Sequence, residues 1–248
     1  LKVTPEDLVV PEYLPLTGEP VLAWTEKLSS TPKTVEYLAG SYILIITHPG
    51  EVFTMDLTSS EKKVRRWHPF RKRIRNHIVD RNSGRLYLVS SMDDKIIAYD
   101  MLNKKQLWKR KIPHIGNHTA LVENTLMVSQ KTGNIMALDS DNGELLESKK
   151  INRQVTGMMH HPIDTLLIIT ADGGVHAYTK KLKPIWKLAI NLNPNPVYTA
   201  NNDRIIMADS NGRIKAIDDK QGELQFELDV HNPIYAPLLL SGERLFIA

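Results

Sequence analysis

The sequence contains no cysteine, and only 6% of its 248 residues are aromatic. The lack of cysteine excludes disulfide bonds, thiolate metal ligands and cysteine nucleophiles. The longest apolar runs, such as residues 42–47 (YILIIT) and 165–170 (TLLIIT), are far shorter than the roughly 20 residues of a membrane-spanning helix. Phosphate-binding glycine motifs, a nucleophile elbow and a His-Glu-x-x-His motif are also missing. We therefore expect no catalytic residue, no metal ion and no cofactor.

A repeat is the clearest positive feature of the sequence. The segment that starts at Gly133 (GNIMALDSDNGELLES) returns further along the chain, at Gly212, as GRIKAIDDKQGELQFE. Three further segments share the frame, and their acidic or equivalent positions follow at nearly even spacing: Asp56, Asp100, Asp139, Thr179 and Asp218. A period of about 40 residues predicts one supersecondary unit that is stacked on itself.

Each unit is expected to consist of strands. Short runs rich in β-branched and apolar residues, such as residues 85–91 and 204–208, precede each copy of the motif. Gly, Asn and Asp separate these runs at the spacing of short antiparallel strands, and no stretch keeps a helical period. Four strands in about 40 residues, repeated, predict an all-β fold of the β-propeller type with four-stranded antiparallel blades.

The repeated phrase resembles the pyrroloquinoline-quinone-type propeller repeat, with a WD-type repeat as the second choice. The aromatic position of that repeat matches Trp108, Trp186 and Phe226, whereas Glu147 and Val64 depart from it. The resemblance implies that the turn after the acidic residue closes the last hairpin and that the aromatic side chain wedges between neighbouring blades. The quinone-dependent dehydrogenases of this family are twice as long and carry a cysteine pair, so the resemblance favours the non-enzymatic BamB-like branch.

The units allow a count of the blades. Residues 33–230 hold five complete units, and a sixth begins after them and stops after its second strand. Residues 7–10 (DLVV) and 16–28, with Trp24 at the docking position, are expected to supply the missing third and fourth strands. We therefore predict one domain over residues 1–248 with six blades, the last shared by both ends, since closure removes free sheet edges. The alternative is a fragment of a seven- or eight-bladed propeller.

One short segment carries most of the positive charge. Residues 62–75 hold eight Lys and Arg residues and no acidic residue, while the whole chain has a formal charge of +4. Such a cluster attracts polyanions in a salt-dependent way. We expect it to form the outer strand of the first blade and the link to the second, and to bind a protein partner, nucleic acid or anionic lipid. The candidate residues are Lys62, Lys63, Arg65, Arg66, Trp67, Arg71, Lys72, Arg73 and Arg75. The competing interpretation is a solvated strand edge.

Histidines form a second candidate site. Asn76–His77 and Asn117–His118 fall near the start of the innermost strand in the blade register, and His160 and His231 are expected at a similar level. A channel-mouth polar site of His77, His118, His160 and His231 follows from this register, and it would suit an anion or a metal. The alternative is that these side chains only bond to neighbouring backbone.

The sequence is compatible with three functions. The first is a non-catalytic protein-binding scaffold or assembly factor that uses the loops of one face. The second is a polyanion binder that uses residues 62–77, and the third is an enzyme that uses the histidines and a carboxylate such as Asp80. The scaffold hypothesis is favoured, with other proteins as partners, and an extracytoplasmic location in the periplasm or cell envelope is preferred to the cytoplasm.

Overall fold

The computed structural model describes a large part of the chain. The described residues are 28, 30–37, 42–48, 50–56, 64–67, 74–101, 103, 105–161, 165–193, 196–201, 203–241 and 244–247. They form strands, turns and links, and no helix among them is long and apolar enough to cross a membrane.

Five four-stranded sheets and one two-stranded sheet follow each other along the chain. Sheet 1 contains β1 (Pro32–Tyr37), β2 (Tyr42–Thr47), β3 (Val52–Asp56) and β4 (Val64–Trp67). Sheet 2 contains β5 (Asn76–Asp80), β6 (Arg85–Ser90), β7 (Lys95–Asp100) and β8 (Lys105–Lys111), and sheet 3 contains β9 (Ile115–Val122), β10 (Thr125–Gln130), β11 (Asn134–Asp139) and β12 (Leu145–Lys150).

The remaining strands continue the same plan. Sheet 4 contains β13 (Val155–His161), β14 (Thr165–Thr170), β15 (Gly174–Thr179) and β16 (Pro184–Ala189). Sheet 5 contains β17 (Val197–Ala200), β18 (Arg204–Ala208), β19 (Arg213–Asp218) and β20 (Leu224–Asp229), and sheet 6 contains β21 (Leu239–Ser241) and β22 (Arg244–Phe246). In each sheet the strands pair in chain order and antiparallel.

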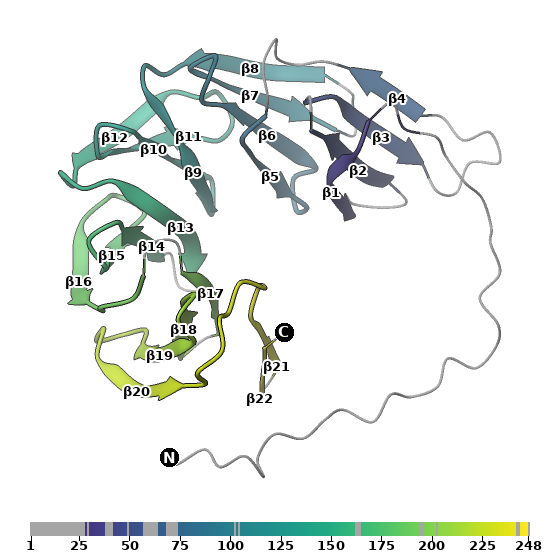
Figure 1. Ribbon diagram of the computed structural model, residues 1–248. Coiled ribbons are helices and arrows are strands. Elements are labelled where there is room, and N and C mark those ends of the chain that lie inside the picture. The colour runs from purple at the N-terminus through teal and green to yellow at the C-terminus, as the bar shows by residue number, and fades with distance from the viewer. Residues whose placement is uncertain are drawn as a thin grey trace, which may run out of the picture.

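The sheets are arranged in an arc, with the first strand of each four-stranded sheet on the inside and the last on the outside (Figure 1). First strands of neighbouring sheets, such as β5, β9 and β13, contact each other. The predicted all-β propeller with four-stranded antiparallel blades is therefore confirmed. We call the end of the sheets where the first strands begin the link face, and the opposite end the hairpin face.

The repeated segment corresponds to the last two strands of a blade. Its two copies cover β11–β12 of sheet 3 and β19–β20 of sheet 5. Ala137 and Ala216, both almost fully buried, lie where the pairing register shifts by one residue. Gly133 and Gly212 have positive φ angles of 80° and 83°, and a Cβ atom there would lie 2.9 and 2.5 Å from the backbone of the following link. The repeat therefore specifies a turn in which only glycine fits, followed by a bulge in the strand pairing.

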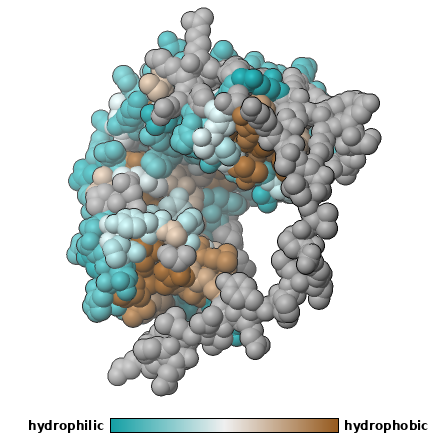
Figure 2. All heavy atoms as spheres, turned by 45° about the vertical axis from the view of Figure 1, so that its right-hand side comes forward, coloured by the Kyte–Doolittle hydropathy of each residue, from teal (hydrophilic) through white to brown (hydrophobic). Residues whose placement is uncertain are grey.

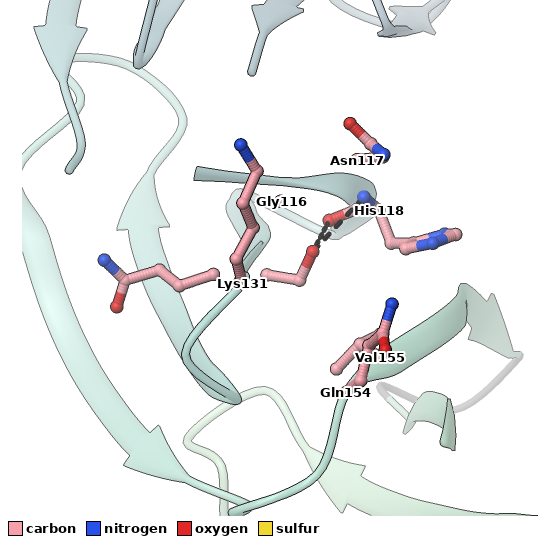
Figure 3. Close-up of a pocket in the computed structure, with 8 residues that line it drawn as sticks. Gly116, Asn117, His118, Lys131, Gln154 and Val155 are labelled. Atoms are coloured by element: carbon pink, nitrogen blue, oxygen red, sulfur yellow. Dashed lines mark hydrogen bonds between the residues drawn. The ribbon is translucent and has the colours of Figure 1, made fainter. Parts of the chain in front are cut away.

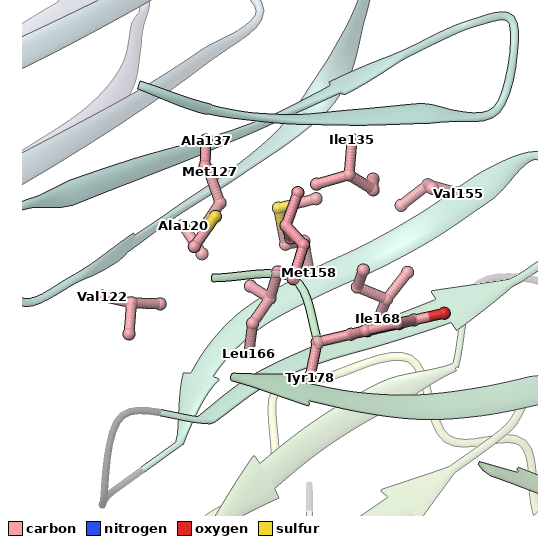
Figure 4. Close-up of a cluster of buried hydrophobic side chains, with 11 residues drawn as sticks. Ala120, Val122, Met127, Ile135, Ala137, Val155, Met158, Leu166, Ile168 and Tyr178 are labelled. Carbon is pink, nitrogen blue, oxygen red and sulfur yellow. The ribbon is translucent and has the colours of Figure 1, made fainter. Parts of the chain in front are cut away.

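The core lies between the sheets rather than inside any one of them. Between sheets 3 and 4, buried side chains from both sheets interlock, among them Met127, Ile135, Leu166, Ile168 and Tyr178 (Figure 4). Equivalent clusters join each other pair of neighbouring sheets. Each fully buried aliphatic side chain contributes roughly 1.5–3 kcal/mol, so the blades are held together mainly by this interlayer packing.

Tryptophan docking fixes neighbouring blades at the hairpin face. The indole N–H of Trp108 on β8 donates to the carbonyl of Ser140 in sheet 3 at 2.9 Å, and that of Trp186 on β16 donates to the carbonyl of Asp219 in sheet 5 at 2.7 Å. A Cβ on Gly143 or Gly222 would lie 2.7 or 2.4 Å from the respective ring. The predicted aromatic wedge is confirmed at both tryptophans.

Phe226 on β20 is half-buried against the last sheet. It packs on the cluster that joins sheets 5 and 6, which includes Ile234 and Leu238. The predicted wedge is therefore confirmed at this position also, although a phenyl ring has no N–H group to donate to the neighbouring turn.

Sheets 3 and 4 pack together without an aromatic residue at the docking position of the outer strand β12. Glu147 replaces the tryptophan on β12 and is exposed, while Leu182 in the turn of sheet 4 is 3% exposed and belongs to the shared core. Leu182 has a φ of 54°, near the values of 74° and 71° at Gly143 and Gly222. A leucine in this left-handed conformation is strained. Leu182 thus adds an apolar side chain from the closing turn of sheet 4 to the core between the two sheets.

The two ends of the arc leave apolar side chains exposed. Val35 and Tyr37 on β1 are 59% and 52% exposed, and Tyr235 and Leu239 near sheet 6 are 74% and 61% exposed. Hydrophobic side chains are visible on either side of the opening in Figure 2. Residues 7–10 and 16–27 of the part predicted to complete the sixth blade lie outside the described residues, so the blade number stays a prediction.

Docking gives a stability prediction with a matched control. Gly222→Ala forces a Cβ against the Trp186 ring, whereas at Gly173, which has a similar φ of 78°, the nearest atom to a Cβ is at 3.7 Å. Both changes carry the strain of alanine at positive φ, but only Gly222→Ala adds overpacking, which costs roughly 1–3 kcal/mol. Urea unfolding should show Gly222→Ala to be the less stable variant by about this amount, and equal stabilities would contradict the docking geometry.

Candidate functional site

Residues 64–67 of the basic segment form β4 (Val64–Trp67), the outermost strand of sheet 1, as predicted. Arg66 is the residue of β4 whose side chain is described, and it forms an ion pair with Glu51. Its guanidinium carbon also lies 5.7 Å from the centre of the Phe53 ring. The Arg66 side chain is 50% exposed and that of Glu51 only 6%. Part of the positive charge of β4 is therefore neutralised within the sheet.

Arg75 lies at the link face, just before β5. Its backbone N–H donates to Val89 at 2.9 Å, and its carbonyl accepts a hydrogen bond from the Lys33 ammonium at 3.1 Å. Burial, with the charge of Arg75 as a smaller cause, lowers the pKa of Lys33. The other candidate residues Lys62, Lys63, Arg71, Lys72 and Arg73 lie outside the described residues, and for Arg65 and Trp67 the backbone is described.

The outermost strands of sheets 2, 3 and 4 extend this positive charge around the molecule. Their charged residues are Lys105, Lys109, Arg110, Lys111, Glu147, Lys149, Lys150 and Lys187, of which one is acidic. On β20 the charged residues are instead Glu227 and Asp229. The outer strands therefore change sign between sheets 4 and 5. Sequence analysis missed this because lysines on successive blades are far apart in the chain and form no local run.

An exposed aliphatic side chain recurs on the same three strands. Leu107, Leu146 and Ile185 are 37%, 55% and 47% exposed. Each is the extra residue at the bulge where the outer strand shifts register. A bulge turns its extra residue out of the regular ladder. We call β8, β12 and β16, with these three residues and the cations beside them, the basic rim.

The four candidate histidines do not lie together. His77 on β5 bonds through Nε2 to the Glu36 carboxylate on β1 at 2.6 Å, which joins the inner strands of sheets 1 and 2. This hydrogen bond is the main reason why the pKa of Glu36 lies below its ordinary value. Asn76, the preceding residue, donates a hydrogen bond from its side-chain amide to the Thr119 hydroxyl on β9 at 2.7 Å. His77 therefore contributes to the joint between blades.

His118 is shifted by one position relative to His77. Thr119 of β9 pairs with Val128 of β10, and His77 of β5 pairs with Leu88 of β6. Val128 and Leu88 occupy the same position in their sheets, so Thr119, and not His118, is the equivalent of His77. The predicted alignment of Asn76–His77 with Asn117–His118 is therefore wrong by one residue, because β9 contains an irregularity that the sequence pattern does not reveal. Burial lowers the pKa of the His118 imidazole below its ordinary value.

The remaining two histidines lie elsewhere. His160 is exposed near the hairpin-face end of β13, at the level of Val79 on β5. His231 follows β20 in a link, with an 85% exposed side chain whose Nδ1 lies 3.2 Å from Asp229. The expected common level of His77, His118, His160 and His231 is therefore wrong. No three metal-ligating side chains in the described part of the chain converge on one point.

His161 and Asp219 form a buried pair that was not predicted as a site. Nε2 of His161 lies 2.9 Å from Oδ2 of Asp219, and the side chains are 1% and 4% exposed. Arg85–Asp141 joins sheets 2 and 3, and Glu123–Lys180 joins sheets 3 and 4, at the same end. The histidine pair therefore belongs to a series of polar contacts between blades, next to the Trp186 docking site.

These features define a protein of the β-propeller class, and the comparisons with known proteins agree. No family model and no curated protein match the chain. Among solved structures, BamB from Moraxella catarrhalis is similar with a TM-score of 0.65 and 17% identity, over 90% of this chain and 69% of that chain. The WD40 domain of Neurospora crassa Pan2 is similar with a TM-score of 0.64 and 11% identity, over 83% of this chain and 68% of that chain. At these identities the likeness supports the fold.

The Glu36–His77 contact gives a prediction about pH. Because the folded-state pKa of Glu36 is lowered, its contribution to stability is present above its ordinary value of 4.5 and is lost as the pH falls through the folded-state pKa. Glu36→Gln removes this titration. Between about pH 6 and pH 3, urea unfolding should therefore show a smaller loss of unfolding free energy for Glu36→Gln than for the parent protein.

The matched control is Glu147→Gln, which removes one exposed carboxylate from β12. Its loss of stability over the same pH range should resemble that of the parent. If Glu36→Gln also follows the parent curve, the contact does not stabilise the folded state.

Proposed function

We propose that this chain is a non-catalytic scaffold that binds other proteins along the basic rim. The observation that carries the proposal is the recurrence of Leu107, Leu146 and Ile185 as exposed aliphatic residues at one structural position of three neighbouring outer strands. Contiguous exposed apolar surface favours an interaction site, and on β12 Leu146 adjoins Leu145, which is 46% exposed. The likeness to two other propellers supports the framework and leaves the partner open.

Strand addition is the mode of binding that best fits this surface. β12 lies at the end of its sheet, so the backbone groups on its outer side face away from β11. An extended segment of a partner can add to such an edge through main-chain hydrogen bonds, while side-chain contacts give specificity. Leu145 and Leu146 offer an apolar contact, and Lys149 and Lys150 offer positive charge. The proposed partner segment is therefore extended, partly apolar and acidic.

The same charges bear on the polyanion hypothesis. Arg66 is paired with Glu51, which reduces its attraction for phosphate, and the aliphatic residues of the rim favour a protein over a nucleic acid. The affinity of a nucleic acid or an anionic lipid would fall steeply with salt. The loops of the link face, where the sequence placed partner binding, are the competing protein surface. We also propose that the protein lies outside the cytoplasm, as the sequence analysis prefers. Fractionation of the source cells tests this location.

Site-specific photocrosslinking distinguishes these surfaces. A photoreactive benzoylphenylalanine at Leu146 on the rim should crosslink a partner protein in the source cells, whereas the same residue at Met92, which is 50% exposed in a link-face turn, should not. Crosslinks formed only from Met92 would move the binding surface to the link face. Crosslinks to nucleic acid or lipid alone would replace the proposal by polyanion binding.

Negative charge at the aliphatic positions of the rim gives a second test. Replacing Leu107, Leu146 and Ile185 together by Glu should abolish partner capture, because it removes the apolar contacts and repels an acidic segment. Each substitution at these exposed positions should change the unfolding free energy by about 0.5 kcal/mol or less, which chemical denaturation checks. The control is Met92→Glu, which should leave capture unchanged. Full capture by the triple variant would contradict the proposal.

A further inference from the structure

The innermost strand of sheet 3 is irregular in a way that the other inner strands are not. β9 is eight residues long. Its pairing with β10 runs from Val128–Thr119 to Gln130–Ile115, so that three residues of β9 face Ser129 alone. In β1 and β13 the same region contains one extra residue, and in β5 and β17 the pairing is regular. A bulge of this kind redirects side chains and often lies at a functional site.

This bulge is held in place by specific contacts. The Ser129 hydroxyl accepts a hydrogen bond from the backbone N–H of His118 at 3.2 Å and donates one to the carbonyl of the same residue at 2.9 Å. Ser129 is 1% exposed. A Cβ on Gly116 would lie 2.4 Å from the Ser129 hydroxyl oxygen, so a glycine is required here. The bulge is therefore a fixed part of the fold rather than a frayed strand end.

The bulge opens a hollow of about 100 Å³ between sheets 3 and 4 at the link face (Figure 3). Three elements contribute its walls: the start of β9, the turn from β10 to β11, and the link into β13. Residues from all three line it, among them Gly116, Asn117, His118, Lys131, Gln154 and Val155. Beside β13 the equivalent region is filled by the side chains of Ile169 and Tyr198, which would lie 2.8 and 3.1 Å from a Cβ on Gly157.

The chemistry of the lining favours a negatively charged group. The lining contains no Asp or Glu, and Lys131 supplies an ammonium group that bonds to the carbonyl of Ser91 at 3.3 Å. The side-chain amides of Asn117 and Gln154 show no hydrogen bond to another described residue. These groups offer N–H donors and one positive charge. Charge-assisted hydrogen bonds from such donors suit the oxygens of a carboxylate or a phosphate.

We propose that this hollow is a binding site for a small oxyanion. Lys131 supplies the charge, the amides of Asn117 and Gln154 supply directional donors, and the locked bulge fixes Asn117 and His118 at the mouth. The imidazole of His118 carries at least one N–H donor in either protonation state. A carboxylate and a phosphate share this chemistry, and the two are separated by experiment. The proposal concerns the link face and is independent of partner binding at the basic rim.

The test is an NMR titration of the full chain with inorganic phosphate and with sodium acetate, each at an ionic strength matched with sodium chloride. At least one of the two probes should shift the side-chain amide signals of Asn117 and Gln154 in a saturable way, and chloride should not. Lys131→Met should weaken binding about tenfold, which corresponds to about 1.4 kcal/mol. Lys109→Met, which removes an exposed lysine from β8, should bind as the parent does.

Asn117→Asp provides a second variant for the same site. It adds a carboxylate at an exposed position, so the fold should persist, as unchanged backbone amide signals would show, while repulsion abolishes binding. Saturation by phosphate alone assigns a phosphate-type ligand, and saturation by acetate alone assigns a carboxylate. The proposal is overturned if neither probe saturates up to about 50 mM, a range in which even millimolar affinity is visible, or if both variants bind like the parent.

Discussion

The contact between the last strand of one blade and the closing turn of the next governs this structure. A four-stranded sheet of about 40 residues cannot bury its own faces, so each blade is stable only against its neighbours. Trp108 and Trp186 fix this relation by combining a large buried ring with a hydrogen bond from the indole to the neighbouring turn. Gly143 and Gly222 are the complementary residues because only a hydrogen atom fits beneath the ring.

This docking contact explains at which positions the repeats share a residue and at which positions they differ. Sheet 4 lacks both the incoming tryptophan and the glycine, and Leu182 supplies the apolar group from the opposite side. The outward positions of the outer strands are free of this constraint. They carry the lysines and exposed aliphatic residues of the basic rim, so the surface proposed for partners lies beside the docking positions without sharing their residues.

The strand content, the blade limits and the docking tryptophans could be predicted from the sequence because they depend on local patterns that recur from blade to blade. The candidate sites could not be predicted to the same degree. The grouping of His77, His118, His160 and His231 failed because the bulge in β9 shifts His118 by one position, and because His231 lies in a link. Contacts such as His161–Asp219 join residues 58 positions apart, and no sequence period marks them.

The central claim is that the closing turn of each blade and the tryptophan of the preceding blade form one packing unit. A double-mutant cycle with Trp186→Ala and Gly222→Ala measures this most directly. If the claim is right, Gly222→Ala costs much less once the ring is absent, and the two changes are non-additive by about 1–3 kcal/mol. If their effects on the unfolding free energy add to within about 0.5 kcal/mol, Trp186 and Gly222 act independently and the account of blade packing is wrong.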